Sequence, residues 1–576
     1  MVKGRIGARS VYDVFDVKAL RGFYTAFHTI RYMRPGQIAW YVLRRGLGVG
    51  GGAIRRGPLW VRGIASRTAF IEPETGQDLV EGVAFLNRFR AFGAGPMDWR
   101  AAAMPKLWRY NLHYFDYLHW PGVSEGRKAE LIASWIAENP PGTPDAWEPY
   151  TVSLRIANWV RLFMQPKWRE QVAQGWLDSL ADQAAWLARN LEYHILANHY
   201  LKNGKALLFA GLFFRGRDAD GWLQLGSRIL REQIREQFLP DGGHYELSPM
   251  YHALCLEDLL DVWNLAQGSE PGLDQELRRE IEGTAWRALD FLAAILMPNG
   301  DIPLFNDSAV GIAPTPAALF GYAERLFRYE RPDDLPRALI DSGYFRLGDG
   351  PDRMIIDCGP VSPSYQPGHT HCDVLSYELA LDGRPIVVDT GVYDYEPSAE
   401  RALSRSTRAH NTVGVDGAEQ SEIWGVFRVA RRARPCLAEL APHTGQGVRF
   451  VGELEGFPLV TGCIRHRREV IYEPPAAWRV EDRVSGSGRH DVDSWIHLHP
   501  DWSAEIKGGS IVVADRAGTV IAVIDPQPGV AVCIEAGQYF PYFGTKLLKQ
   551  VVRLSVRGPL PIALGYAIRK AGAAAV

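Results

Sequence analysis

Apolar residues between about positions 80 and 330 recur at intervals of three and four, as at Leu131, Ile132 and Trp135. This spacing is typical of amphipathic helices that bury one face against a core. Further helices are predicted at 169–190, 199–214, 221–237, 252–267, 277–297 and 315–328. Many antiparallel helices with short joints containing Pro and Gly indicate an α/α toroid or a helical solenoid. Without a clean fixed-period repeat, the pattern leaves that choice open.

The pattern changes after about residue 335, where short runs of β-branched and aromatic residues are separated by turn residues. They predict strands at 354–357, 376–381, 386–388, 412–415, 477–484, 511–513, 520–524 and 551–556. Such strands without a long helix between them are typical of a large antiparallel β-sandwich. We therefore predict an α+β multidomain chain. Its parts are an N-terminal extension packing on the helical domain (1–80), the helical domain itself (81–332) and a β-sandwich domain (333–576).

Composition excludes few classes of protein. The 576 residues are 47% hydrophobic and 23% charged, which is ordinary for a globular protein. The net charge is −2, so no overall positive field indicates nucleic acid as a partner. The 18 Trp and 23 Tyr are compatible with stacking on sugars, although each one can equally fill a core.

Neither export nor a membrane span is predicted. The six cysteines form no CxxC pair and are expected to be reduced thiols. The N-terminus lacks the apolar core of a signal peptide, and no run of about 18 apolar residues occurs. A cytoplasmic location is expected, with a periplasmic or secreted location by another route left open. The basic, aromatic stretch 30–45 could rest on an anionic surface, although a solvated helix packing on the domain behind it is the simpler interpretation.

Candidate chemistry is densest in a polar loop and the hairpin predicted to follow it. His369 and His371 lie two residues apart, so an extended chain points both rings to one side. The Asp-Gly pair at 382–383 predicts a hairpin turn, Asp389 ends the return strand, and His410 follows in the next polar loop. Three imidazoles and one carboxylate around one hairpin indicate a catalytic or metal site rather than ordinary hydrogen-bonded residues.

Three segments of the helical domain are polar and aromatic where helix packing would not require it. They span residues 108–117, 147–159 and 197–207. Arg155 and Asn158 share a helix face, and an arginine suits bidentate binding of carboxylate or sulfate, with an internal salt bridge as the alternative. Asn198 and His199 stand at a helix start, where an asparagine is also an ordinary N-cap. Farther on, Tyr251 lies in the first turn of a predicted helix, where a tyrosine can simply pack.

Taken together, these segments resemble the heparinase II/III superfamily of polysaccharide lyases. The matching motifs occur in the family's order over about residues 100–500. They are Asn198-His199, Glu246-Leu-Ser-Pro-Met-Tyr-His252, Leu304-Phe-Asn-Asp-Ser308, His369-Thr-His-Cys-Asp373, Val387-Val-Asp-Thr-Gly391 and Arg408-Ala-His-Asn-Thr412. The resemblance implies an incomplete α/α toroid followed by an antiparallel β-domain. It also implies eliminative cleavage of a uronate-containing chain.

By motif, the resemblance implies that Asn198 neutralises the uronate carboxylate, that Tyr251 is the catalytic tyrosine and that His369 is its partner. Chemistry explains these residue types. Removing the C5 hydrogen builds negative charge next to the carboxylate, which an amide donor stabilises. A base must take this proton and an acid must protonate the departing O4. A tyrosine can do both in a syn elimination, whereas for the opposite uronate epimer the histidine is better placed as the base.

The resemblance also implies one divalent metal ion, bound by His371, Asp389 and His410. Two histidines and one carboxylate favour zinc or manganese, and we expect a structural role that holds His369 in position. A regular two-residue hairpin would place Asp389 opposite Ser376 rather than near His371. A bulge or a curled loop is therefore needed to bring the three ligands together.

We predict a polysaccharide lyase acting on glycosaminoglycans such as hyaluronan, chondroitin sulfate or heparan sulfate, with an alginate-type polyuronate as the near alternative. A glycoside hydrolase would need two facing carboxylates, for which Glu148, Glu246 and Asp307 are unpaired candidates. A non-catalytic polysaccharide-binding accessory protein is a third possibility. The oligomeric state is left open. Expected substrate contacts are Asn111, His113, Tyr150, Arg155, Asn158, His199, His252, Arg405 and Trp424.

Overall fold

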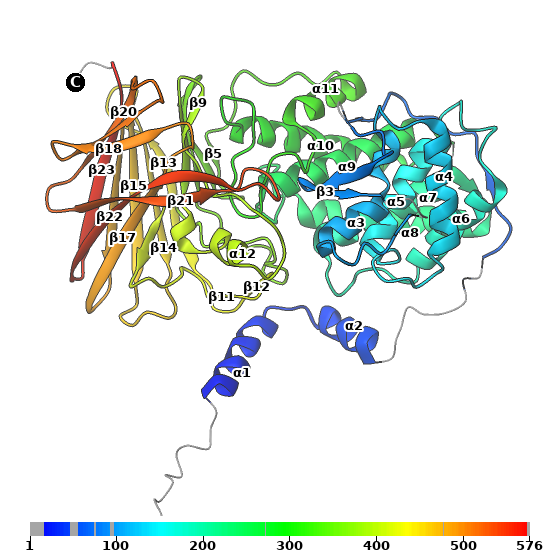
Figure 1. Cartoon of the computed structure of the whole chain (residues 1–576), viewed down its shortest axis with the longest axis horizontal. Coiled ribbons are helices and arrows are strands. Elements are labelled where there is room, and N and C mark those ends of the chain that lie inside the picture. Colours follow the sequence, from blue (N-terminus) through cyan, green and yellow to red (C-terminus); the bar gives the residue numbers. More distant parts are fainter. Residues whose placement is uncertain are drawn as a thin grey trace, which may run out of the picture.

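The computed structural model describes residues 17–46, 54, 56–73, 76–92, 97–270, 272–475 and 477–572. Helices gather in one half of the molecule and strands in the other (Figure 1). The helical half comes first in the sequence and ends with α11 (Pro316–Phe327), after which β5 (Ala338–Leu339) opens the strand half. This order confirms the predicted α+β architecture.

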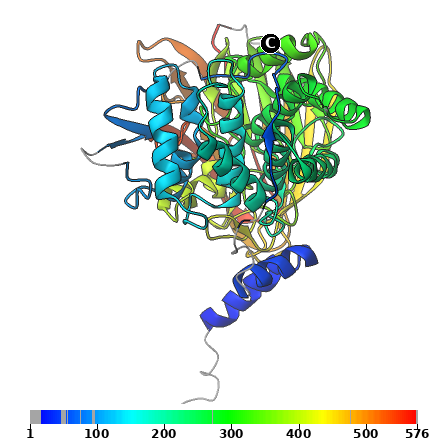
Figure 2. The ribbon, with the colours of Figure 1, turned by 90° about the vertical axis from the view of Figure 1, so that its right-hand side faces the viewer.

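The helical half follows the apolar spacing of the sequence. Its helices before α11 are α3 (Lys106–Tyr114), α4 (Glu125–Glu138), α5 (Pro149–Phe163), α6 (Gln174–Leu187), α7 (Ala197–Phe213), α8 (Arg217–Gln237), α9 (Pro249–Gln267) and α10 (Gln275–Ile295). The predicted helices are all present, with ends shifted by a few residues. Figure 2, which looks onto this half, shows the helices lying side by side as a curved layer.

Helix α7 lies in the middle of this layer, and every one of its residues except His199 is buried. Glycines let α8 approach it closely. A Cβ added at Gly211 would lie 2.5 Å from the backbone nitrogen of Leu223, and one at Gly226 would lie 2.7 Å from the carbonyl oxygen of Gly204. Such distances require glycine. The N-terminal end of α7, which carries Asn198, is thus held by a rigid core.

The strand half contains three main sheets, and every strand pair within them is antiparallel among the described residues. One has five strands in sequence order: β5, β6 (Tyr344–Asp349), β7 (Asp352–Asp357), β8 (Tyr377–Leu381) and β9 (Arg384–Val387). A second has the order β10 (Val413–Val415), β17 (Arg489–His497), β22 (Leu547–Pro559) and β21 (Ala531–Tyr539). The third has the order β13 (Arg434–Pro442), β14 (Val448–Glu455), β15 (Arg465–Glu473), β16 (Ala477–Ser485), β23 (Ile562–Lys570), β20 (Val520–Pro526), β19 (Ser510–Ala514) and β18 (Ser503–Lys507).

One apolar cluster draws on all three sheets, with Phe345, Phe450 and Val552 as members from each. The sheets therefore pack face to face around a shared core, as expected for a β-sandwich. Strands β8 and β9 form the predicted hairpin, whose turn residues Asp382 and Gly383 have φ values of 51° and 75°. The register shifts between Leu379 and Ala380, so this hairpin contains a β-bulge.

The N-terminal part runs under both halves. Helices α1 (Val17–Ile30) and α2 (Pro35–Gly46) lie on one side of the molecule, below the main body in Figures 1 and 2. Farther on, β1 (Trp60–Val61) pairs with β4 (Phe214–Arg215) of the helical half. Within the described ranges, no helix is both long and apolar enough to cross a membrane.

Candidate active site

Two aromatic rings meet where loops of the helical half reach the strand half. Tyr251 lies in the first turn of α9, where the Ser248 side chain caps the helix by accepting the Tyr251 N–H at 3.2 Å. His369 lies in the loop between β7 and β8. The two rings stack with their centroids 3.8 Å apart. The hydroxyl groups of Tyr251 and Tyr395 are 3.3 Å apart. A phenol and an imidazole from different halves are thus in direct contact.

Burial raises the pKa of Tyr251 well above that of an ordinary tyrosine, and Tyr395 and the nearby carboxylates Asp307 and Glu246 raise it further. The phenol is therefore protonated at neutral pH. Its side chain is nevertheless not fully buried, and His369 also keeps part of its surface exposed. Both side chains are therefore partly exposed to solvent.

Glu246 connects Asn198 to His369. The Nδ2 group of Asn198 donates to both carboxylate oxygens of Glu246, at 3.0 and 3.1 Å, and the Asn198 backbone N–H donates to the same carboxylate at 2.9 Å. The second oxygen of Glu246 lies 3.2 Å from Nε2 of His369. The Oδ1 atom of Asn198 is buried without a hydrogen-bond partner. The predicted catalytic trio of Asn198, Tyr251 and His369 is therefore brought together, with an unpredicted carboxylate at its centre.

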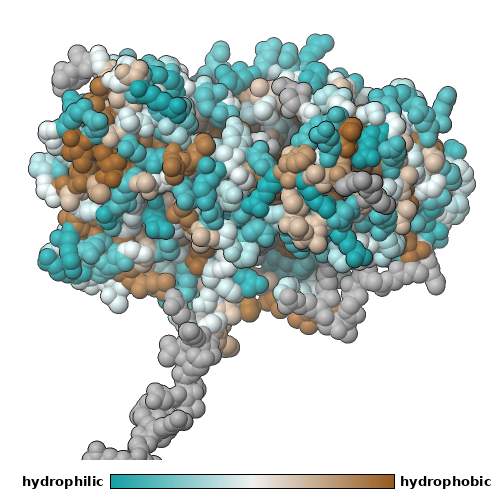
Figure 3. Space-filling model, in the orientation of Figure 1, coloured by the Kyte–Doolittle hydropathy of each residue, from teal (hydrophilic) through white to brown (hydrophobic). Residues whose placement is uncertain are grey.

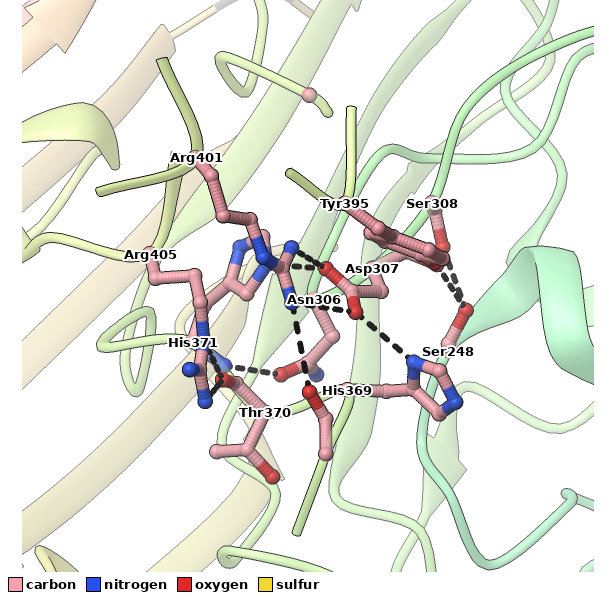
Figure 4. A network of polar contacts seen from close by, with 12 residues as sticks. Ser248, Asn306, Asp307, Ser308, His369, Thr370, His371, Tyr395, Arg401 and Arg405 are labelled. Atoms are coloured by element: carbon pink, nitrogen blue, oxygen red, sulfur yellow. Dashed lines mark hydrogen bonds and ion pairs between the residues drawn. The ribbon is translucent and has the colours of Figure 1, made fainter. Parts of the chain in front are cut away.

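Asp307 holds the other side of His369, as Figure 4 shows. Its Oδ2 lies 2.8 Å from Nδ1 of His369 and its Oδ1 lies 2.7 Å from Nε2 of His371. Arg401, in α12 (Ala399–Ser404), donates to both oxygens of this carboxylate. Burial alone would raise the pKa of Asp307, but the Arg401 charge and the two histidine hydrogen bonds outweigh burial and hold it well below its usual range. The charged carboxylate fixes both imidazoles.

A second polar group lies beside the trio in the helical half. Nδ1 of His199 is 3.0 Å from Glu192, and the rings of His199 and Tyr150 are 4.3 Å apart. Burial would lower the pKa of His199, but the charge of Glu192 outweighs it and raises this pKa. His199 and Tyr150 are partly exposed. These two predicted substrate contacts are therefore accessible next to Asn198.

The remaining predicted contacts are mostly internal. Arg155 is fully buried, donates to Gln183 and the His113 carbonyl, and packs over the Trp135 ring. Arg405 is 1% exposed and donates to the carbonyl groups of Thr370, Gly425 and Val426. The prediction that these arginines contact substrate is therefore corrected. Because both are buried, each binds carbonyl oxygens or neighbouring side chains inside the protein instead.

Five further predicted contacts are also engaged inside the protein. His113 accepts from Trp135, Asn158 donates to Tyr114 and Asp116, His252 contacts the Ala288 carbonyl, Asn111 donates to the Leu107 carbonyl, and Trp424 donates to Thr29. The first three are buried, which removes them from substrate contact. Trp424, in β11 (Ile423–Trp424), is partly exposed but faces α1 rather than the Tyr251–His369 stack.

His371, His410 and Asp373 form a buried group whose possible ligand atoms lie within 4.8 Å of one another. Nδ1 of His371 and Nε2 of His410 have no hydrogen-bond partner, although both are buried. Two free imidazole nitrogens and a carboxylate are a donor set that suits zinc or manganese. These residues therefore fit a divalent ion.

Asp389, predicted as the carboxylate ligand, instead lies 2.7 Å from Nδ1 of His410. It orients the ring whose other nitrogen faces the group, as outer partners of metal-bound histidines do. Asp373, rather than the predicted Asp389, is therefore the carboxylate that lies together with His371 and His410 in this group. The reason is the curl of the loop before β8, where Asp373 lies two residues beyond His371.

Four residues of the site were not given a role from the sequence: Glu246, Asp307, Tyr395 and Arg401. Glu246 and Asp307 lie within the motifs that carry the resemblance, where the sequence indicates them only as unpaired candidate carboxylates of a hydrolase. The structure engages both of them with the same histidine, one at each ring nitrogen. No sequence signal singled out Tyr395 or Arg401, because both follow β9 in a stretch without a matching motif.

The chain has a helical half followed by an antiparallel β-sandwich, and a tyrosine, a histidine and an asparagine meet where the two halves join. This is the architecture that the sequence motifs predicted from their resemblance to polysaccharide lyases. Residues 128–324 match the family description Heparinase II/III N-terminus. Residues 331–573 match Heparinase II/III-like, C-terminal. The chain belongs to the heparinase II/III superfamily.

Relatives of known name agree with this assignment. A heparin-sulfate lyase of Pedobacter heparinus is 27% identical over 320 residues, which make up 49% of this chain and 47% of that protein. A heparin-sulfate lyase of Bacteroides thetaiotaomicron is 28% identical over 427 residues, covering 66% of this chain and 58% of that protein. The chain thus spans about half the length of the curated relatives it matches.

Solved structures agree in fold. Heparinase III superimposes with a TM-score of 0.67 at 19% identity, covering 84% of this chain and 80% of that one. A heparan sulfate lyase from Pedobacter heparinus gives a TM-score of 0.57 at 20% identity, covering 85% of this chain and 81% of that one. These similarities confirm the predicted fold of a toroid followed by a β-sandwich.

Proposed function

We propose that this protein is a polysaccharide lyase that cleaves uronic-acid-containing polysaccharide by β-elimination. The observation that carries the proposal is the stack of Tyr251 on His369, with Asn198 held next to it through Glu246. These side chains supply a phenol and an imidazole for proton transfer and an amide for charge stabilisation. The partial exposure of the stacked pair supports access by a sugar ring.

The protonated phenol of Tyr251 suits the acid role. In the reaction the C5 hydrogen is removed, the C4–O4 bond breaks, and a C4–C5 double bond forms. Tyr251 delivers its proton to the departing O4, and His369 takes the C5 hydrogen when that hydrogen lies on the opposite face. A syn elimination by Tyr251 alone would require its phenolate to take the C5 proton before returning it to O4, so the protonated phenol favours a division of the two transfers between Tyr251 and His369. Asn198 stabilises charge on the uronate carboxylate, so substrate binding must redirect at least one amide hydrogen away from Glu246.

The substrate class that we infer is a glycosaminoglycan, with alginate-type polyuronate as the alternative. Two relatives from different organisms are both named heparin-sulfate lyases, which supports a sulfated uronate polymer. His199 is partly exposed beside Asn198, and Glu192 raises its pKa, which favours the imidazolium form where an acidic sugar would bind.

Incubation with a panel of polymers tests this proposal. The panel comprises hyaluronan, chondroitin sulfate, heparan sulfate, heparin and alginate, each followed by the ultraviolet absorbance of the unsaturated uronate. We expect absorbance to rise with at least one glycosaminoglycan, because only elimination creates the C4–C5 double bond. Release of reducing ends without absorbance would indicate a hydrolase. Binding without either signal would indicate an accessory protein, and both outcomes would reject the lyase.

We further propose that His371, His410 and Asp373 hold one divalent ion, zinc or manganese, with Asp389 orienting His410. When bound, the ion would supply a structural link between the loop before β8 and the segment before β10. Its effect on the site would pass through His371, because Nε2 of His371 and Nδ1 of His369 bind the same carboxylate, Asp307.

Chelation is therefore expected to lower the melting temperature and activity together, since a ligand bound to the native state stabilises it. Elemental analysis should find about one ion per chain in protein purified without chelators. His371→Ala should lose the ion. His466→Ala is the matched control, because His466 is also buried, also binds a carboxylate and also has an unpaired Nδ1, yet lies outside the group. Fully active protein without metal would contradict the proposal.

A further inference from the structure

Helices α1 and α2 turn apolar side chains toward solvent. In α1, Phe23, Phe27 and Ile30 are 74%, 55% and 49% exposed, and their spacing of four and three residues places them on one face. In α2, Ile38 and Val42 are 37% and 62% exposed and again lie four residues apart. A surface helix normally buries its apolar face, so an exposed apolar stripe on two consecutive helices indicates an interaction surface.

The opposite side of this helix pair is fixed to the protein by polar and aromatic contacts. In α1, Thr29 accepts the indole N–H of Trp424 from the strand half at 2.9 Å. In α2, Trp40 stacks on Tyr193 of the helical half with ring centroids 5.1 Å apart. The pair is therefore anchored to both halves, and its apolar stripes cannot turn inward without breaking these contacts.

Arg34, at the start of α2, adds a further anchor. Its guanidinium pairs with Glu236 of α8 and lies 3.8 Å from the centre of the Tyr365 ring. Tyr365 in turn lies within hydrogen-bond distance of both Glu236 and Tyr245. The α1–α2 helix pair is therefore held against the rest of the molecule and presents one face outward.

The same segment is strongly basic. Between Val17 and Gly46 the sequence contains no Asp or Glu. It contains six basic residues: Lys18, Arg21, Arg31, Arg34, Arg44 and Arg45. The whole chain has a net charge of −2, so this excess of positive charge is local.

We propose that α1 and α2 form a docking surface for an anionic lipid bilayer. Exposed Phe, Ile and Val combined with Lys and Arg are the features of helices that lie in the membrane interface. Apart from Arg34, which anchors the pair to the protein, the basic residues of this segment supply positive charge that attracts anionic headgroups. The apolar stripes enter the region between headgroups and acyl chains. With 14 and 12 residues, the helices are too short to span a bilayer, so they would lie on its surface.

The exposed apolar side chains favour a lipid surface over a polyanionic polysaccharide as the partner. A sulfated polymer would be bound by arginines and lysines and would gain little from Phe23, Phe27, Ile30 or Val42. The strand half also exposes apolar residues (Figure 3), among them Ile506 and Val520. There, Glu505 and Lys507 flank Ile506 and pair with each other, so basic charge is not in excess. This contrast supplies a matched control.

The test is co-sedimentation of the full chain with vesicles, without any polysaccharide, so that its outcome does not depend on the lyase proposal. Vesicles of phosphatidylcholine alone are compared with vesicles that also contain phosphatidylglycerol. We expect binding to be about tenfold or more stronger with the anionic lipid, because the α1–α2 segment has an excess of positive charge. Raising the salt concentration should weaken it.

The double variant Phe27→Glu with Val42→Glu should lose vesicle binding, whereas Ile506→Glu with Val520→Glu should bind as the unchanged chain does. Circular dichroism and melting temperature check that both variants remain folded. Absence of binding to anionic vesicles, or equal binding by both double variants, would overturn the proposal. Two further outcomes would also overturn it. Retention on immobilised heparin that the Phe27→Glu, Val42→Glu variant loses, without vesicle binding, would assign the surface to a polyanion. Self-association that the same variant abolishes would assign the surface to a second copy of the chain.

Discussion

Tyr251→Phe is expected to reduce turnover of a cleavable polysaccharide by about 10²–10⁴-fold, the usual contribution of a general acid or base. The substitution removes one hydroxyl group and its 3.3 Å contact with Tyr395, and it leaves the ring stacked on His369. Since the phenol of Tyr251 is protonated, the lost function is proton delivery to the departing O4. Substrate binding, measured by calorimetry, should change little because the ring and Asn198 remain.

Tyr329→Phe is the matched control for this experiment. Tyr329 is a buried tyrosine of the helical half whose hydroxyl, like that of Tyr251, contacts one side chain: it donates to Asp290 at 2.8 Å and makes no contact with the Tyr251–His369 stack. It should keep normal kcat while losing a similar small amount of stability. Near-normal kcat in a folded Tyr251→Phe variant would eliminate the phenol as acid or base.

Local periodicity was sufficient to predict the secondary structure around this tyrosine. The spacing of apolar residues located α9, and the Ser-Pro pair at 248–249 explains why the helix begins there. The Asp-Gly pair at 382–383 likewise predicted the β8–β9 hairpin, because φ > 0 at both turn residues favours these types. Such features depend on neighbours in sequence, so a single sequence contains them.

Roles that depend on burial were harder to predict. Arg155 and Asn158 share a helix face, as their spacing predicts, but that face is directed into the protein. Trp135 and the His113 carbonyl, which bind Arg155, come from α4 and α3. Which face of a helix meets the site is set by packing between helices, and the sequence of α5 alone does not contain that information.

The surroundings of His369 could not be predicted for the same reason. Glu246, Asp307 and Arg401 come from three segments separated by more than fifty residues each, and they converge because the loops of both halves meet. Motif matching identified the histidine itself. Its contacts with a carboxylate at each ring nitrogen follow from tertiary structure, as does the replacement of Asp389 by Asp373 in the candidate metal group.

Asp307→Asn is expected to cost both stability and activity. An asparagine of the same shape removes the negative charge that Arg401, His369 and His371 share, which leaves the Arg401 charge buried without its partner. Breaking a buried ion pair in this way costs about 3–5 kcal/mol of unfolding free energy. Activity should fall further than stability predicts, because the amide no longer fixes the orientation of His369.

The pH dependence of the unfolding free energy gives a second measure of the effect of Asp307→Asn. The pKa of Asp307 is lower in the folded state than in the unfolded state, so its ionised form contributes stability that is fully present above the ordinary carboxyl pKa of about 4. That stability is lost as the pH falls below this value toward the folded-state pKa. In Asp307→Asn this part of the acid-induced loss should be absent when denaturation is followed between neutral and acidic pH.

Asp482→Asn is the control that separates stability from function. Like Asp307, Asp482 is a buried carboxylate shared by an arginine and a histidine. Its oxygens lie 2.7 Å from Nε of Arg468 and 2.8 Å from Nε2 of His466. Unlike Asp307, it lies in β16 and binds no residue of the Tyr251–His369 stack. Its variant should lose comparable unfolding free energy and yet retain kcat at a temperature where it is folded. If both variants lost kcat equally under those conditions, Asp307 would be a structural carboxylate and His369 would not depend on it for its position.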